Sequence, residues 1–209
     1  MKNEIKKPLF KPSTRDILIS LKHGIAYAKL LIGRSKPYDS FLEKMISSNF
    51  LLTDENLPSV KHISQQFNFQ YPVVAKWIKT IYEDIFILNN EEANLFYKNE
   101  ELPFNLIFKY FDQYCYFTTS LRLLPRIGDA FEFFFIKAKV GTYRFYVTDI
   151  EHQLNENRHE ISVYLNGSIY NPYFELLKKR ALFEGTISFM DYIKTSEYEL
   201  ENRLRKIYK

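Results

Sequence analysis

Cysteine is almost absent from this chain of 209 residues, and Cys115 is the only one. A single thiol excludes an internal disulfide and a cysteine-based zinc site. The six glycines form no cluster, which excludes a phosphate-binding glycine loop, and no Gly-x-Ser-x-Gly elbow occurs. No apolar run approaches the roughly 20 residues that cross a bilayer, and no signal-peptide core follows the basic start. We therefore expect a soluble, cytoplasmic protein that does not enter a membrane.

Aromatic residues are abundant and charge is unevenly distributed. The chain contains 19 Phe and 16 Tyr, and 46% of its residues are hydrophobic, enough for the core of one large or two small domains. Residues 1–82 hold 13 Lys or Arg against 6 Asp or Glu, whereas residues 83–209 hold 16 against 19. A basic charge confined to one region indicates contact with a polyanion, with a solvated basic face as the alternative.

Helical and strand-like patterns succeed one another and predict an α+β protein. Five segments are expected: a basic N-terminal arm (1–12), a helical domain (13–88), a polar linker (89–103), an antiparallel β domain (104–171) and C-terminal helices (172–209).

The helices are predicted from apolar spacing and from the residues that begin and end them. Ser13 offers a cap for a helix that runs to Leu31 or Ile32, and a shorter helix follows over 39–49. Near the end of the chain, one helix is expected over 172–183 before Gly185, and another over 189–208.

Aromatic and β-branched residues predict strands in the following part of the chain. The predicted strands are 104–111, 114–121, 130–140, 142–152 and 160–165. Because their connections are short, we expect antiparallel pairing. About five short strands favour a small β-barrel or a curved sheet, SH3-like by analogy alone.

Residues 59–82 have a specific spacing of apolar, small and turn-forming positions. Val60 and Ile63 are apolar, and the small residue Ser64 would let two helices cross closely. After Phe67 comes Asn68, a residue type that tolerates a left-handed backbone. In the second helix, the other features are the starting Gln70, the early Pro72 and the apolar pair Val74 and Trp77, which we expect to be buried.

This segment resembles the helix-turn-helix DNA-binding motif, with Ser64 for the usual alanine and Asn68 for the usual glycine. The resemblance implies that the second helix lies in the major groove of duplex DNA. The residues expected at DNA are Lys61, Gln70, Tyr71, Val73, Lys76 and Lys79. An alternative is a pair of ordinary core helices, with the lysines as solvated charges.

Three other features are candidate sites. Tyr143 to Tyr146 interleave aromatic and basic residues, as single-strand nucleic-acid platforms do, but a half-buried strand shows the same pattern. His152 and His159 would be neighbours across a hairpin and could hold a metal, but they lack a third ligand, so surface residues near a turn are favoured. Cys115 is expected to be a core residue. We expect no enzyme, no cofactor and no metal.

The sequence thus favours a protein that binds duplex DNA in a sequence-dependent way, a transcriptional regulator or a protein of a phage or other mobile element. Homo-oligomerisation would let it span two half-sites, with the helix from Phe189 as the candidate contact. The alternative is a structural or assembly subunit of a larger complex or virus particle. In that case the helical pair and the aromatic strands would be protein interfaces.

Overall fold

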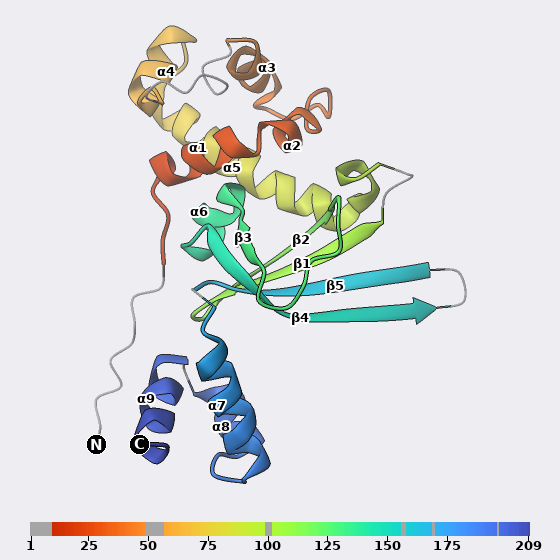
Figure 1. The fold of residues 1–209 in the computed structure, drawn as a ribbon. Helices are drawn as coiled ribbons and strands as arrows, with labels where there is room; N and C mark the ends of the chain where they lie inside the picture. The colour runs from red at the N-terminus through yellow and green to blue at the C-terminus, as the bar shows by residue number, and fades with distance from the viewer. Residues whose placement is uncertain (1–9, 49–56, 99–101, 156–157, 169, 196) are drawn as a thin grey trace. The chain divides into compact units, whose positions relative to one another are not determined.

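The computed structural model describes residues 10–48, 57–98, 102–155, 158–168, 170–195 and 197–209. Most of the predicted basic arm lies outside these ranges. The chain forms two compact units, residues 1–168 and residues 169–209. As predicted, the protein is α+β, with helices before and after a sheet (Figure 1).

Among the described residues of the first unit, five α-helices precede the sheet. They are α1 (Thr14–His23), α2 (Ile25–Lys29), α3 (Asp39–Ser47), α4 (Val60–Gln66) and α5 (Tyr71–Glu91). The predicted cap is confirmed, because the Ser13 hydroxyl accepts a hydrogen bond from the Asp16 amide and the Asp16 carboxylate accepts one from the Ser13 amide.

The predicted first helix is divided at Gly24 into α1 and α2. A Cβ atom at Gly24 would overlap the ring of Phe135, so the absence of a side chain lets the aromatic ring reach the backbone. The residue at the break is therefore in contact with a ring that is far away in the sequence.

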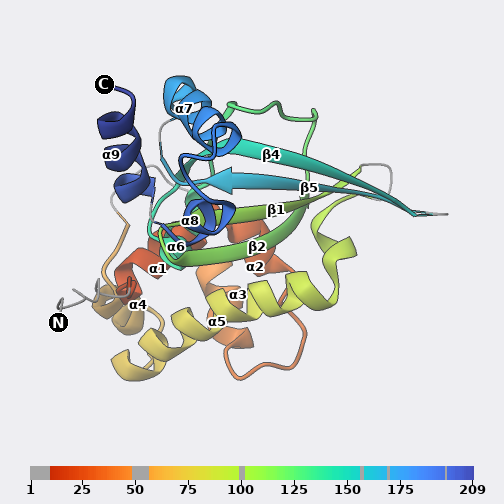
Figure 2. The same ribbon diagram turned by 90° about the horizontal axis from the view of Figure 1, so that it is seen from below.

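The sheet contains five strands, curled into a half-barrel. They are β1 (Pro103–Tyr110), β2 (Gln113–Ser120), β3 (Ala130–Glu132), β4 (Arg144–Asn155) and β5 (Arg158–Asn166), in the order β2-β1-β5-β4-β3. The β1–β2 and β4–β5 hairpins are antiparallel, and the β4–β5 hairpin projects past the other strands (Figure 2).

The sheet is mixed, so the prediction of purely antiparallel pairing was wrong. β1 and β5 run parallel, with Phe104 opposite Ile161. Short turns fix the direction of strands within each hairpin, but they do not fix how two hairpins join. The long connection between β2 and β4 permits the parallel pair.

The predicted strand over 130–140 was wrong after Glu132. Its second part forms a 3₁₀ helix, η2 (Phe134–Ile136), and a short helix, α6 (Lys137–Val140). Phe135 and Ile136 are fully buried, and the Phe135 ring packs near Tyr82 and Phe86 of α5. These aromatic residues fill the space between helices and sheet instead of alternating along a strand.

Helices and sheet share one continuous hydrophobic core, so the predicted linker over 89–103 does not separate two cores. Asn89, in the last turn of α5, is 1% exposed and exchanges two hydrogen bonds of 2.8 Å with the backbone of Thr118 in β2. The 3₁₀ helix η1 (Ala93–Phe96) follows, and Phe96 is buried in the same core.

The second unit contains α7 (Pro172–Phe183), α8 (Phe189–Lys194) and α9 (Glu197–Ile207). The Asn171 side chain caps α7, which ends before Gly185 at a φ of 68°. The single helix predicted over 189–208 is two helices. The small core of the second unit consists of Phe174, Leu177, Ala181, Ile187, Leu200 and Leu204.

Candidate nucleic-acid interface

α4 and α5 are joined by a tight turn with the predicted backbone geometry. Ser59 caps α4 by accepting a hydrogen bond from the amide of His62. Asn68 has a φ of 57°, the left-handed conformation that the sequence predicts at this position. The amide of Phe69 then donates to the carbonyl of Ser64 over 2.9 Å. Pro72 lies in the first turn of α5, as expected.

The close crossing of α4 and α5 rests on small and apolar residues. Ile63, Ser64 and Val74 are buried between the helices, as predicted. The prediction that Trp77 is buried together with Val74 was wrong: Trp77 is only partly buried, and Ile78 takes the fully buried position beside Val74. The Trp77 ring instead covers the edge of the core, with its centroid 5.1 Å from that of Phe69 and 5.6 Å from that of Phe41 in α3.

The six residues predicted to contact DNA form what we call the candidate DNA face. Its members are Lys61, Gln70, Tyr71, Val73, Lys76 and Lys79. All are exposed except Val73, which is partly buried. Val73, Lys76 and Lys79 are spaced by three, so they line one side of α5. Lys61 lies in the first turn of α4, the other helix of the pair.

The candidate DNA face is basic and uncompensated. No Asp or Glu occurs between residues 56 and 82. Within the described ranges, none of Lys61, Lys76 and Lys79 lies within 4.0 Å of a carboxylate. The absence of acidic residues from this stretch of the sequence indicates a basic surface independently of the motif.

Acidic residues begin later on α5, and each of the next two is held by a basic residue. Glu83 pairs with Lys139 of α6, and Asp84 pairs with Lys36 at 3.3 Å. α5 therefore has a basic N-terminal half, followed by two acidic residues that are paired with lysines of other segments.

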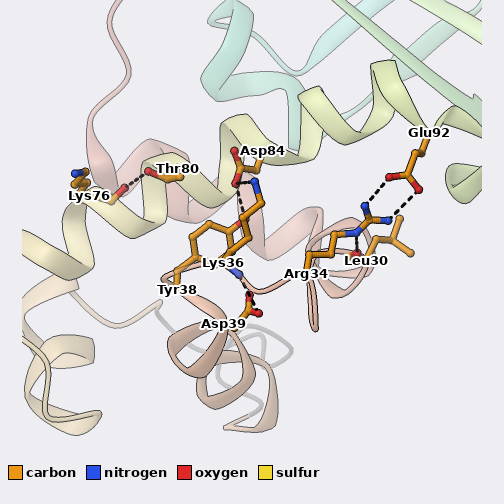
Figure 3. Close-up of polar contacts among 9 residues, drawn as sticks. All are labelled: Leu30, Arg34, Lys36, Tyr38, Asp39, Lys76, Thr80, Asp84 and Glu92. Carbon is orange, nitrogen blue, oxygen red and sulfur yellow. Dashed lines mark hydrogen bonds and ion pairs between the residues drawn. The ribbon is translucent and has the colours of Figure 1, made fainter.

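Figure 3 shows how the segment between α2 and α3 is fixed to this second half of α5. The Tyr38 hydroxyl donates to Asp84 over 2.6 Å, and the Arg34 guanidinium donates to both carboxylate oxygens of Glu92. Burial and the neighbouring Asp84 raise the pKa of Tyr38, so its hydroxyl remains a donor. These contacts lie along α5 beyond Lys76, which takes part in Figure 3 only through its backbone carbonyl, the acceptor of a hydrogen bond from the Thr80 hydroxyl.

The first turn of α5 offers few free amides to an anion. The Gln70 side chain makes no capping hydrogen bond, but Pro72 has no amide hydrogen and the amides of Val73 and Val74 both donate to the Gln70 carbonyl. The N-terminal end of a helix carries a partial positive charge that favours phosphate. Lys44 of α3 lies outside the segment that resembles the motif, so the sequence did not indicate it. Its exposed ammonium lies 4.9 Å from the centre of the Phe69 ring beside the turn.

The strand residues Tyr143 to Tyr146 do not present a set of free rings. Phe145 and Tyr146 are buried, and the Tyr143 ring stacks on Phe134 with centroids 4.1 Å apart. The residues serve the core and the edge of β4, as the alternative interpretation proposes.

His152 and His159 are neighbours across the β4–β5 hairpin, with ring nitrogens 2.9 Å apart. No group of three metal-ligating residues occurs in the part of the chain that the structure describes. Cys115 is buried, which raises the pKa of its thiol to about 12 and leaves it a poor nucleophile. Of the helices in the described ranges, none is long and apolar enough to cross a bilayer.

Comparison with known proteins adds no family to these observations. No family model, curated protein or solved structure matches the chain. Functional inference therefore depends on the geometry and charge of the candidate DNA face.

Proposed function

We propose that this protein binds duplex DNA by placing the N-terminal half of α5 in the major groove. The observation that carries the proposal is a helix-turn-helix geometry at Asn68 combined with an exposed face of three lysines, none of which has a carboxylate partner in the described ranges. Neutralising phosphates with such side chains releases counterions and supplies sequence-independent affinity. The helix geometry then brings neighbouring side chains to the edges of bases.

Each residue of the candidate DNA face has a role that its chemistry supports. Gln70 would make a paired contact with adenine, and Val73 would contact a thymine methyl group. Lys76 and Lys79 would read guanine or neutralise phosphate. Lys61, on α4, would position the protein on the phosphate backbone without reading sequence. A defined target sequence would make the protein a regulator or a mobile-element protein that acts at chosen sites.

The test is a gel-shift titration with random duplex DNA, followed by sequence selection. The variant Lys76→Glu/Lys79→Glu should weaken binding by about tenfold or more, because two attractive contacts become repulsive. A matched control is Lys98→Glu/Arg122→Glu, which reverses two exposed charges beyond the C-terminal end of α5. The control should bind as the unchanged protein does, and both variants should keep the native circular dichroism spectrum.

An equal loss of DNA affinity in both variants would indicate a nonspecific effect of charge, and it would reject the candidate DNA face. Failure to bind duplex DNA at low salt, together with assembly into a large defined oligomer, would instead support the structural-subunit hypothesis.

A further inference from the structure

Two of the four histidines of the chain meet on the β4–β5 hairpin, and we call His152 and His159 the histidine pair. Leu154 lies opposite His159 and His152 lies opposite Ile161, so the two histidines are diagonal neighbours on one face of the hairpin. Nδ1 of His152 is 2.9 Å from Nε2 of His159, and their ring planes differ by 29°. An N–H of one imidazole is therefore directed to the lone pair of the other.

The histidine pair is accessible, and its donor atoms are nitrogens. His152 is exposed and His159 is partly buried, on a hairpin that projects past the other strands (Figure 2). The acidic residues next to them in the sequence lie on the opposite face of the hairpin, because side chains alternate along a strand. One of these, Glu151, accepts hydrogen bonds there from Tyr164 and Gln153. The face of the pair thus offers imidazole to an ion and not carboxylate.

We propose that the histidine pair binds a divalent late transition metal, Cu²⁺ or Ni²⁺. Imidazole nitrogen lies about 2.0–2.1 Å from a bound metal. With 2.9 Å between the two nitrogens, the angle that they subtend at a shared metal is about 90°. This is the angle between adjacent ligands in the square-planar and tetragonal sites that Cu²⁺ and Ni²⁺ prefer. A tetrahedral Zn²⁺ site requires a larger separation of the nitrogens, about 3.3 Å.

Metal binding requires two local changes in the histidine pair. Both facing nitrogens must offer a lone pair, so the imidazole that donates must move its proton to its other ring nitrogen. Each ring must also turn about χ2 until its lone pair points at the metal, and this torsion is broad in histidine. Because His152 is exposed, its turn meets little packing.

The remaining positions around the metal belong to water, since the described part of the chain contains no group of three metal-ligating residues. The pair supplies half of the ligands of a closed four-ligand site. We therefore expect a Kd in the micromolar range, about 1–100 µM. Mg²⁺ and Ca²⁺ select oxygen ligands and should not bind there. This inference does not depend on DNA binding.

The test is isothermal titration calorimetry of the full chain with each metal alone, at about pH 7.5, above the ordinary pKa of histidine. The unchanged protein should bind Cu²⁺ more tightly than Ni²⁺, and Mg²⁺ should not bind. His152→Gln and His159→Gln should each weaken Ni²⁺ binding by about tenfold or more. The control His62→Gln removes an exposed histidine of α4 and should leave the affinity unchanged. Far-UV circular dichroism should show native folding in all three variants.

Hydrogen exchange locates the bound metal. Ni²⁺ should slow the exchange of amides in β4 and β5 in the unchanged protein and should not do so in His152→Gln. Binding of Cu²⁺ and Ni²⁺ no tighter than that of Mg²⁺ would overturn the proposal, and so would unchanged affinity in both variants of the pair. An equal loss in His62→Gln would indicate nonspecific binding to surface histidines. Tighter binding of Zn²⁺ than of Cu²⁺ would reject the geometry of about 90°.

Discussion

Asn68 lies in the turn between α4 and α5, the two helices of the candidate DNA face, and its φ of 57° is left-handed. Asparagine tolerates this conformation, glycine adopts it freely, and a β-branched residue is strained in it. We expect Asn68→Gly to leave the free energy of unfolding almost unchanged, and Asn68→Val to lower it by about 1–2 kcal/mol.

Urea unfolding followed by the fluorescence of Trp77, the only tryptophan, measures both variants. Equal stability of the valine variant and the unchanged protein would mean that the turn does not require the left-handed backbone.

At the scale of elements, the break between α1 and α2 shows how the sheet-side residues shape the helices. A Cβ at Gly24 would overlap the Phe135 ring. Gly24→Ala should therefore lower the free energy of unfolding by about 1–3 kcal/mol, and Phe135→Leu should relieve part of that loss by removing ring atoms. A double-mutant cycle measures this coupling.

Gly33 supplies the matched control for this cycle. It also tolerates alanine poorly, since its φ is 77°, but nothing lies within 4 Å of a Cβ placed there. The effects of Gly33→Ala and Phe135→Leu on the free energy of unfolding should add. Coupling as strong at Gly33 as at Gly24 would show that the Phe135 contact does not cause the break.

Elements fixed by neighbours in the chain could be predicted, and those fixed by distant residues could not. The Ser13–Asp16 cap, the turn at Asn68 and the early Pro72 each depend on a few adjacent residues. At Gly24, the space of a side chain is taken by the Phe135 ring, more than a hundred residues away, and the parallel β1–β5 pair joins residues of two separate hairpins.

The same distinction applies to the candidate DNA face. Helical spacing predicted which side of α5 is exposed, because residues three or four apart lie on the same side of a helix. It could not predict that Trp77 would lie at the edge of the core, because that position depends on Phe41 of α3. The ion pairs of Asp84 and Glu83 likewise depend on the folded positions of Lys36 and Lys139.

At the scale of the whole molecule, α5 runs from the turn after α4 to the sheet of the first unit (Figure 1). Its N-terminal half carries the candidate DNA face, while Asn89 in its last turn makes two hydrogen bonds with the backbone of the edge strand β2. Because helices and sheet share one core, the first unit should unfold in a single step.

Asn89→Ala tests this single core. The substitution leaves the backbone amide and carbonyl of Thr118 without their partner, which should cost about 1–3 kcal/mol. The free energy of unfolding measured by Trp77 fluorescence, which reports on the helices, should fall. The free energy of opening measured by hydrogen exchange of amides in β1 and β5 should fall by the same amount. A shift confined to the strands would show that helices and sheet unfold as separate domains.

The most direct measurement of the central claim is the dependence of duplex affinity on salt concentration. Each lysine that neutralises a phosphate adds about 0.9 to the slope of log K against log salt, so Lys76→Gln/Lys79→Gln should reduce the slope by roughly 1.8. Lys98→Gln/Arg122→Gln should leave the slope unchanged. The claim that the N-terminal half of α5 faces DNA would be contradicted if the lysine variant kept the slope of the unchanged protein.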